Sequence, residues 1–271
     1  MYKIPQKISN RLSQGIKSFQ PILEAANSRD VNEADTVTII IDILSDVLGY
    51  DKYHEITKEF QIRGTYCDLA TKIDGKVNLL IEVKAIGIEL KEQHIKQAVD
   101  YASNEGIDWV ILTNGLMWMI YRVQFVKPIN SELVYCFNYL ELNNKKQQDL
   151  ELLYPLSKEG SQKASLEVLH DQRQILSKFF LGALILSDNT LNIFRRELRK
   201  QSDGINITIE EIEEVLKTEV IKREVMESDK LKDSLKKLSR QPNKKQRPPK
   251  SKVENSEVKE QAHILNINLV D

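Results

Sequence analysis

The chain has few of the features that mark secreted or membrane proteins. Its 271 residues include only two cysteines, Cys67 and Cys136, and neither lies in a C-x-x-C pair, so we expect no disulfide framework and no zinc ribbon. The longest uninterrupted apolar run, Phe179 to Leu186, is far shorter than a membrane span, and the polar start MYKIPQKISNRLSQ lacks the apolar region of a signal peptide. These absences predict a cytoplasmic protein without membrane contact.

The chain also lacks a large charge of one sign. The formal net charge is -1, so the overall electrostatics give no indication of a nucleic-acid partner. A composition of 41% hydrophobic and 29% charged residues is typical of a soluble globular protein. Because the length exceeds the commonest domain size, we expect one domain of ordinary length and an extension.

Hydrophobic periodicity predicts an α/β domain over residues 1–150. A helix is expected around Ile8 to Ala26, and a second between the N-cap residue Asn32 and Gly49. From Glu55 onward the pattern changes to strands, then to a helix ending near residue 105, and then to a second hairpin. The expected order is αβββαββ in a mixed central sheet flanked by helices, with a further strand possible at Glu132 to Leu140.

Beyond about Leu150 the strand pattern stops, and we expect a helical extension over residues 164–230 after a boundary between Leu150 and Lys163. Its helices are expected at Leu166 to Leu186, Thr190 to Lys200 and Ile209 to Met226. The stretch RQPNKKQRPPKSK holds three prolines and six basic residues with no acid, which predicts a disordered basic tail over 238–271. This tail could hold phosphates or be only a linker.

Asp68, Glu82 and Lys84 are the residues that could carry chemistry. Phosphodiester hydrolysis needs a divalent cation, carboxylates to hold it and a group that positions the attacking water. Because side chains alternate along a strand, Glu82 and Lys84 project from one face, and Val83 turns into the core. The carboxylate and the ammonium would therefore flank one point.

The loop between the two strands decides whether Asp68 joins Glu82. A two-residue loop, Asp74-Gly75, would set Asp68 opposite Ile81 and turn Glu82 to the other face. A three-residue loop would set Asp68 directly across from Glu82, close enough to share one cation. A nuclease site therefore requires the longer loop or an equivalent bulge.

Cys67-Asp68 followed by Glu82-Val83-Lys84 resembles the PD-(D/E)xK nuclease motif, and the element order resembles the core of that fold. The bare pattern occurs by chance in many hairpins as a solvated face. The segments NEADT, LGYD, IEVKA and VILTNGLMWMIY are more specific, and over Val31 to Val123 the chain resembles the nuclease domain at the N-terminus of type I restriction enzyme R subunits. Cys67 stands where the motif has proline, at a position that varies in these nucleases.

The resemblance implies roles for individual residues. Asp68, Glu82 and the Val83 carbonyl would hold Mg²⁺, with Mn²⁺ as a substitute, and Lys84 would orient the attacking water. Glu33, the only acid on the packing face of its helix, would support metal or water; the alternative is a helix-start glutamate favoured by the dipole.

Two residues on the helix after the motif strand complete the expected site. Gln97 and Tyr101, one turn apart, resemble the Q-x-x-x-Y element of RecB-like nucleases and would position the scissile phosphate or the lysine. Both lie off the apolar stripe of that helix, so the alternative is a solvated edge.

The resemblance also implies a function. The chain has no G-x-x-x-x-G-K-[ST] loop, so we expect a stand-alone, Mg²⁺-dependent restriction-type endonuclease acting on DNA, with other restriction or defence subunits or a homo-oligomer left open as partners. One alternative is a catalytically inactive nucleic-acid-binding or assembly module. Another is a helical oligomerisation protein whose function lies after Leu150.

Overall fold

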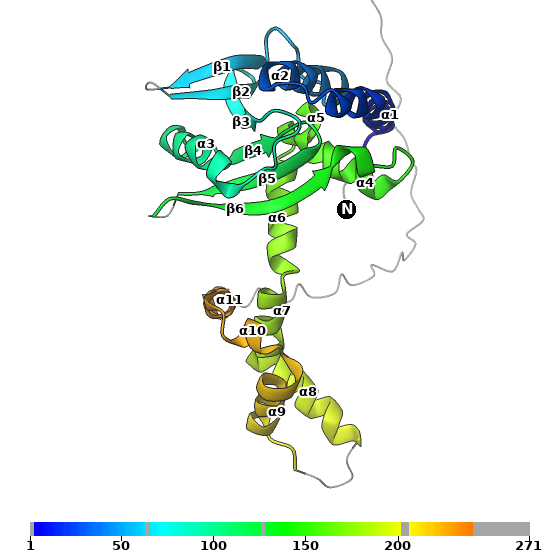
Figure 1. The fold of residues 1–271 in the computed structure, drawn as a ribbon. Helices are drawn as coiled ribbons and strands as arrows, with labels where there is room; N and C mark the ends of the chain where they lie inside the picture. Colours follow the sequence, from blue (N-terminus) through cyan, green and yellow to red (C-terminus); the bar gives the residue numbers. More distant parts are fainter. Residues whose placement is uncertain (1–2, 63–64, 126–127, 202–205, 241–271) are drawn as a thin grey trace, which may run out of the picture. The chain divides into compact units, whose positions relative to one another are not determined.

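A computed structural model describes residues 3–62, 65–125, 128–201 and 206–240, and six strands form one mixed sheet whose order follows the sequence (Figure 1). The strands are β1 (Ile56–Ile62), β2 (Thr65–Ile73), β3 (Lys76–Val83), β4 (Trp109–Thr113), β5 (Met117–Gln124) and β6 (Asn130–Asn138). β3 and β4 run parallel, and the other neighbouring strands are antiparallel. A parallel pair needs a crossover, which α3 (Glu92–Glu105) provides. The expected element order is confirmed.

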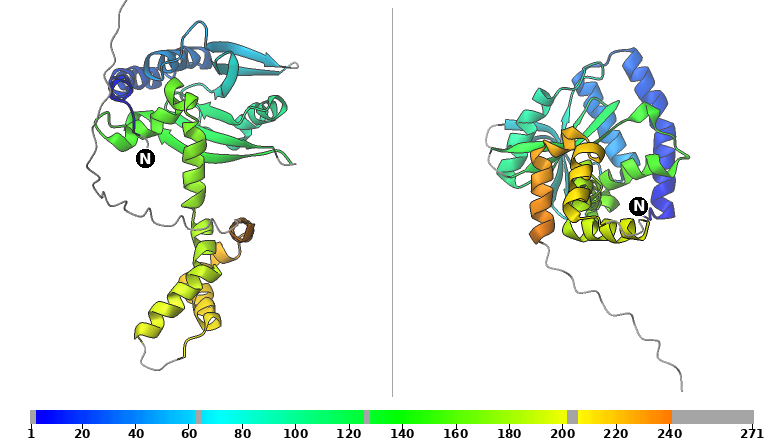
Figure 2. Two further views of the ribbon diagram at one scale, coloured as in Figure 1. Left: turned by 180° about the vertical axis from the view of Figure 1, so that it is seen from behind. Right: turned by 90° about the horizontal axis from the view of Figure 1, so that it is seen from below.

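Helices cover both faces of the sheet. α1 (Gln6–Ser28) and α2 (Glu33–Asp42) pack on one face, where they bury Leu79, Ile81 and Val83 of β3 (Figure 2). α3 packs on the other face, over Leu80 of β3 and its neighbours on β4. Successive residues of β3 point to opposite faces, and its last five residues are all buried because helices cover both faces.

The helix before the sheet begins and ends where its sequence predicts. The Asn32 side chain accepts a hydrogen bond from the Asp35 N–H at 2.9 Å, which caps α2. α2 continues as a π-helical turn over Ile43–Val47, and Gly49 follows with a φ of 85°. Glycine adopts this left-handed conformation without strain, so the chain can turn away here.

After β6, the part of the chain that the structure describes is mainly helical. Its helices are α4 (Gln147–Leu153), α5 (Lys158–Gln162), α6 (Ser165–Ile175), α7 (Lys178–Ile185), α8 (Asp188–Gln201), α9 (Ile209–Val215), α10 (Arg223–Met226) and α11 (Asp229–Arg240). The continuous helix expected at Leu166 to Leu186 is wrong, because the Ser177 hydroxyl accepts a hydrogen bond from the Phe180 N–H and starts α7 as a new helix. The sequence did not predict α11.

Contacts between residues divide the chain into two units, 1–181 and 182–271. The division lies beyond the expected boundary between Leu150 and Lys163. The reason is that apolar residues of α4 to α6 belong to the core on the α1 side of the sheet, namely Leu150, Leu153, Tyr154, Leu156 and Leu166. An ion pair between Arg11 and Glu159 at 2.6 Å adds a polar contact between α1 and α5.

Two expectations concern the remaining chain. Of the basic stretch Arg240 to Lys252, only Arg240 belongs to the described residues, so the expected disorder of this stretch lies outside them. In the described part of the chain, every helix is too short or too polar to cross a membrane.

Candidate functional site

The turn between β2 and β3 has two residues, and it does not by itself set the register of the site. Ile73 pairs with Lys76 across Asp74-Gly75, whose φ angles of 51° and 77° are those of a tight hairpin turn. Continued regularly, this pairing would place Asp68 and Glu82 on opposite faces.

A β-bulge corrects the register. Lys72 pairs with Val77 but Thr71 pairs with Leu79, so Asn78 is an extra residue on β3. From there on, the pairing runs to Leu69 and Ile81, and one further step carries Asp68 across from Glu82. The register that a nuclease site requires is confirmed, and it arises from the bulge rather than from a longer loop.

Side chains take over where the ladder between β2 and β3 ends. The carboxylate of Asp68 accepts a hydrogen bond from the Val83 N–H at 2.7 Å, and the Cys67 thiol donates to the Ile81 carbonyl at 3.4 Å. Asp68 is therefore fixed on the backbone of the strand that carries Glu82, which itself is only 9% exposed. Val83 is fully buried, as the strand pattern predicts.

Lys84 lies among the oxygen atoms of this site. Its ammonium donates hydrogen bonds to Glu82 Oε1 at 2.7 Å and to the Val83 carbonyl at 2.9 Å. Glu33 Oε2, at the first turn of α2, lies 3.6 Å from the same ammonium. The structure thus brings Asp68, Glu82, Lys84 and Glu33 together, although the Glu33 side chain is 49% exposed.

Burial and like charges shape the electrostatics of the site. Burial raises the pKa of Asp68, and the hydrogen bond from Val83 and the charge of Lys84 only partly oppose this. Burial also raises the pKa of Glu82, and the charge of Asp68 raises it further against the hydrogen bond from Lys84. For Lys84, burial alone would lower the pKa, but the hydrogen bond to Glu82 and the nearby acids raise it. The site therefore holds two carboxylates that a cation would stabilise.

The donor atoms fit a hard divalent cation. Carboxylate oxygens of Asp68 and Glu82 and the Val83 carbonyl are the ligand types that Mg²⁺ takes, with water completing its octahedron. The Lys84 ammonium already places a positive charge on two of these three groups. Among the described residues, however, no three Asp, Glu, His or Cys side chains converge as a metal cluster. Glu33 lies beside Lys84, with its Oε2 3.6 Å from the ammonium.

Gln97 and Tyr101 have different surroundings although they lie one turn apart on α3. Gln97 is exposed, whereas Tyr101 is only 4% exposed and donates its hydroxyl hydrogen to the Phe60 carbonyl at 2.9 Å. The solvated-edge alternative is wrong for Tyr101, because the residue packs in the core beneath α3. A direct contact between Tyr101 and phosphate would require its hydroxyl to leave Phe60.

Asn114 supports the site from a position that the sequence did not single out. Its buried side chain donates to the carbonyls of Ile86 and Ile88 at 3.1 and 3.0 Å and accepts from the N–H groups of Leu116 and Met117. These bonds tie the loop after Lys84 to the turn between β4 and β5. In the sequence, the Asn114-Gly115 pair indicates only a hairpin turn.

A backbone bond reinforces this support, and a further acid lies nearby. The Lys84 N–H donates to the Thr113 carbonyl at 2.9 Å.

Glu59 of β1, whose φ of 45° is left-handed, adds negative charge that raises the pKa of Asp68. In sequence, Glu59 looks like an ordinary strand residue, so no signal would have found it.

Comparison with known protein families covers this hairpin. Residues 38–134 match the family of the type I restriction enzyme R protein N terminus. The matched residues run from within α2 to within β6. They include Asp68, Glu82 and Lys84 but not Glu33. The match confirms the resemblance that the sequence motifs indicate, and it supports a role in restriction. No curated protein and no solved structure matches the chain.

Proposed function

We propose that this chain is a Mg²⁺-dependent DNA endonuclease of the restriction type. One observation carries the proposal: the Asn78 bulge sets Asp68 across from Glu82 within the stretch that matches the R-protein N terminus. If Asn78 were instead paired in a regular ladder after the two-residue turn, the two carboxylates would lie on different faces of the sheet and could not share an ion.

The residues of the site would divide the work of phosphodiester hydrolysis. Asp68, Glu82 and the Val83 carbonyl would hold the cation, whose charge stabilises the negative charge that develops on the phosphate. Lys84, charged and fixed by two hydrogen bonds, would orient the attacking water and stabilise the same charge. Glu33 would act through the Lys84 ammonium, from 3.6 Å away. Gln97, exposed on α3, remains a proposed phosphate contact.

Incubation with supercoiled plasmid and Mg²⁺ or Mn²⁺ tests the proposal. The wild-type protein is expected to nick or linearise the plasmid, and Asp68→Ala and Lys84→Ala are expected to lose at least about 100-fold in rate, the scale of removing one transition-state charge interaction. Lys91→Ala, which changes an exposed lysine outside the site, is the matched control and should cleave at the wild-type rate.

Two results would contradict the proposal. Equal cleavage by all variants would identify a contaminating nuclease and remove the assigned roles. DNA binding without cleavage at any divalent ion would favour the catalytically inactive binding or assembly module instead.

A further inference from the structure

Hydrophobic burial alone does not secure the register of the site. Residues Leu79 to Val83 of β3 are all buried and, except for Glu82, all apolar, and helices cover both faces of the sheet. A strand that is apolar on both faces buries nearly as much surface in one register as in the next. Another contact is therefore needed to keep Asn78 out of the regular ladder.

Tyr50 supplies a buried hydroxyl near the bulge. The residue follows Gly49, after the π-helical turn that ends α2, and is only 2% exposed. Its hydroxyl donates to the Leu156 carbonyl at 3.2 Å and lies 3.0 Å from the Ser161 hydroxyl of α5. Because a hydroxyl has one hydrogen and two lone pairs, the oxygen of Tyr50 can still accept from other donors.

Two side chains of the hairpin lie close to this hydroxyl. Burial raises the pKa of Tyr50. Three neighbouring side chains partly oppose this rise, namely those of Ser161, Thr71 and Asn78. Thr71 Oγ1 and Asn78 Nδ2 are buried and form no hydrogen bond in the described part of the chain, so they act on the hydroxyl as nearby dipoles.

The hydroxyl gives the bulge a fixed place. Asn78 is the extra residue of β3, and Thr71 pairs with the next residue, Leu79, so both polar side chains flank the bulge. A buried amide is costly unless a polar group lies beside it. If the bulge moved along the hairpin or became regular, the Asn78 amide would leave the Tyr50 hydroxyl.

We propose that Tyr50 is a positioning residue for the metal site. Its hydroxyl holds the bulge at Asn78, and this bulge sets Asp68 across from Glu82. The effect of Tyr50 on metal binding rests on the proposed function, whereas its effect on the hairpin does not. The bond to Ser161 places the same hydroxyl against α5, so the contact also joins the hairpin to the helices after the sheet.

Tyr50→Phe in the full-length protein removes only the hydroxyl and keeps the ring in the core. In EDTA, the Val83 N–H reports the register because it donates to the Asp68 carboxylate. Amide hydrogen exchange of Val83, measured by NMR, should become at least about tenfold faster relative to Val123, whose N–H donates to the Asp108 carbonyl elsewhere in the sheet. Isothermal titration should show a Mn²⁺ affinity that is about tenfold lower.

Tyr135→Phe is the matched control. The Tyr135 hydroxyl donates to the Leu152 carbonyl at 3.1 Å in the same core, on β6, which is not a neighbour of β3 in the sheet. This variant loses a comparable buried bond, so it should lose stability as Tyr50→Phe does. Its Mn²⁺ affinity and its Val83 exchange relative to Val123 should stay at the wild-type values.

A double variant tests whether Tyr50 acts through Asn78. Asn78→Ala should lower the Mn²⁺ affinity as Tyr50→Phe does. Tyr50→Phe/Asn78→Ala should lower it no further, because both changes remove the same contact. Additive losses would overturn the proposed action through the bulge.

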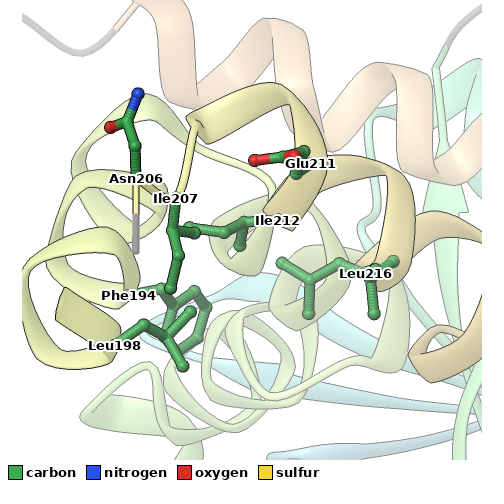
Figure 3. Close-up of a pocket in the computed structure, with 8 residues that line it drawn as sticks. Phe194, Leu198, Asn206, Ile207, Glu211, Ile212 and Leu216 are labelled. Atoms are coloured by element: carbon green, nitrogen blue, oxygen red, sulfur yellow. The ribbon is translucent and has the colours of Figure 1, made fainter. Parts of the chain in front are cut away.

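The second unit supplies a further control. All residues of the proposed site belong to the first unit, 1–181. Figure 3 shows an apolar groove of the second unit, lined by residues of α8 and α9 that include Leu198 and Ile212. Leu198→Ala shortens one of these side chains and should leave the Mn²⁺ affinity and the Val83 exchange unchanged.

The two measurements separate this inference from the proposed function. Wild-type Val83 exchange in Tyr50→Phe would overturn the positioning role, and so would a wild-type Mn²⁺ affinity of this variant. Faster Val83 exchange in Tyr50→Phe, together with a wild-type protein that binds no Mn²⁺, would support the hold on the hairpin and contradict the proposed function instead.

Discussion

The Nζ atom of Lys84 lies 2.7 Å from Oε1 of Glu82, so a lysine charge occupies the place where a metal ion would meet this carboxylate. The same ammonium is bound to the Val83 carbonyl. The Lys84 ammonium is therefore hydrogen-bonded to two of the three groups that we assign to the cation. A divalent ion held as proposed would compete with the Lys84 ammonium for these oxygen atoms.

This competition predicts that Lys84→Met binds divalent ions more tightly than the wild type. Loss of the ammonium frees Glu82 and Val83 and removes the repulsion between two positive charges, so Mn²⁺ affinity at pH 8 should rise by about tenfold, which is about 1.4 kcal/mol. Electron paramagnetic resonance of free Mn²⁺ measures this affinity without any cleavage. Lys91→Met should bind like the wild type, and weaker binding by Lys84→Met would show that the lysine supports the ion instead.

The raised pKa of Asp68 and Glu82 predicts how ion binding depends on pH. Both groups must be ionised to hold a cation, and both take up a proton at a higher pH than ordinary carboxyl groups. During acidification, Mn²⁺ affinity should therefore fall at a higher pH than it would at a site of two ordinary carboxyl groups. A fall that follows only the ordinary carboxyl range would contradict the electrostatics described for the site.

The same shifts predict that Asp68 costs stability when no metal is bound. A carboxyl group whose pKa is raised in the folded state binds its proton more tightly there, so stability decreases as pH rises from the unfolded pKa through the folded pKa and stays lower above it. Asp68→Asn removes this charge and keeps an oxygen that can accept from Val83. In EDTA at pH 7.5 its Tm should exceed that of the wild type, by about 2–4 °C for each 1 kcal/mol relieved.

Added Mg²⁺ should raise the wild-type Tm above that of Asp68→Asn. The ion stabilises only a protein that binds it in the folded state, so the wild-type Tm should rise with Mg²⁺ and that of Asp68→Asn should not. Differential scanning fluorimetry measures both effects. A lower Tm for Asp68→Asn in EDTA would show that its carboxylate stabilises the metal-free fold.

The bulge at Asn78 gives a test of register. Deletion of Asn78 should leave a regular hairpin in which Asp68 still faces Glu82, so plasmid cleavage should persist. Deletion of both Val77 and Asn78 shifts the pairing by one more residue, which turns Glu82 to the other face and should abolish cleavage. Circular dichroism checks that both proteins fold. A folded but inactive single deletion would show that the bulge has a role beyond register.

Asn114 should matter for stability as well as for the loop after Lys84. Asn114→Ala leaves the buried carbonyl of Ile86 and the carbonyl of Ile88 without this donor and should lower the free energy of unfolding by about 1–3 kcal/mol in urea titration. Asn104→Ala, on the exposed side of α3, is the matched control and should change it little. An unchanged stability of Asn114→Ala would show that the loop is held by other contacts.

Local sequence signals predicted the elements of the sheet domain well, because each element satisfies its own pattern. Asn32 and Gly49 define one helix, and short, largely apolar runs define the buried parts of β3 and β4. Trp109, Trp118 and Tyr121 fill the core, as their strand spacing indicates.

What the sequence could not fix depends on contacts between distant residues. The bulge at Asn78 was one of two ways to satisfy the register, and only strand pairing decides between them. Burial of Tyr101 depends on how α3 packs against Phe60 of β1. A helical wheel of α3 alone cannot predict this contact. Ser177 ends one helix and starts another through a single side-chain hydrogen bond, within a stretch whose apolar composition favours a continuous helix.

Isothermal titration with Mn²⁺ tests most directly whether Asp68 and Glu82 share one ion. The wild-type protein should bind one ion per chain at this site, and Asp68→Asn and Glu82→Gln should each lose that binding while keeping the wild-type circular dichroism spectrum. Retention of the ion by both variants would contradict the central claim, because the two carboxylates could then not be its ligands.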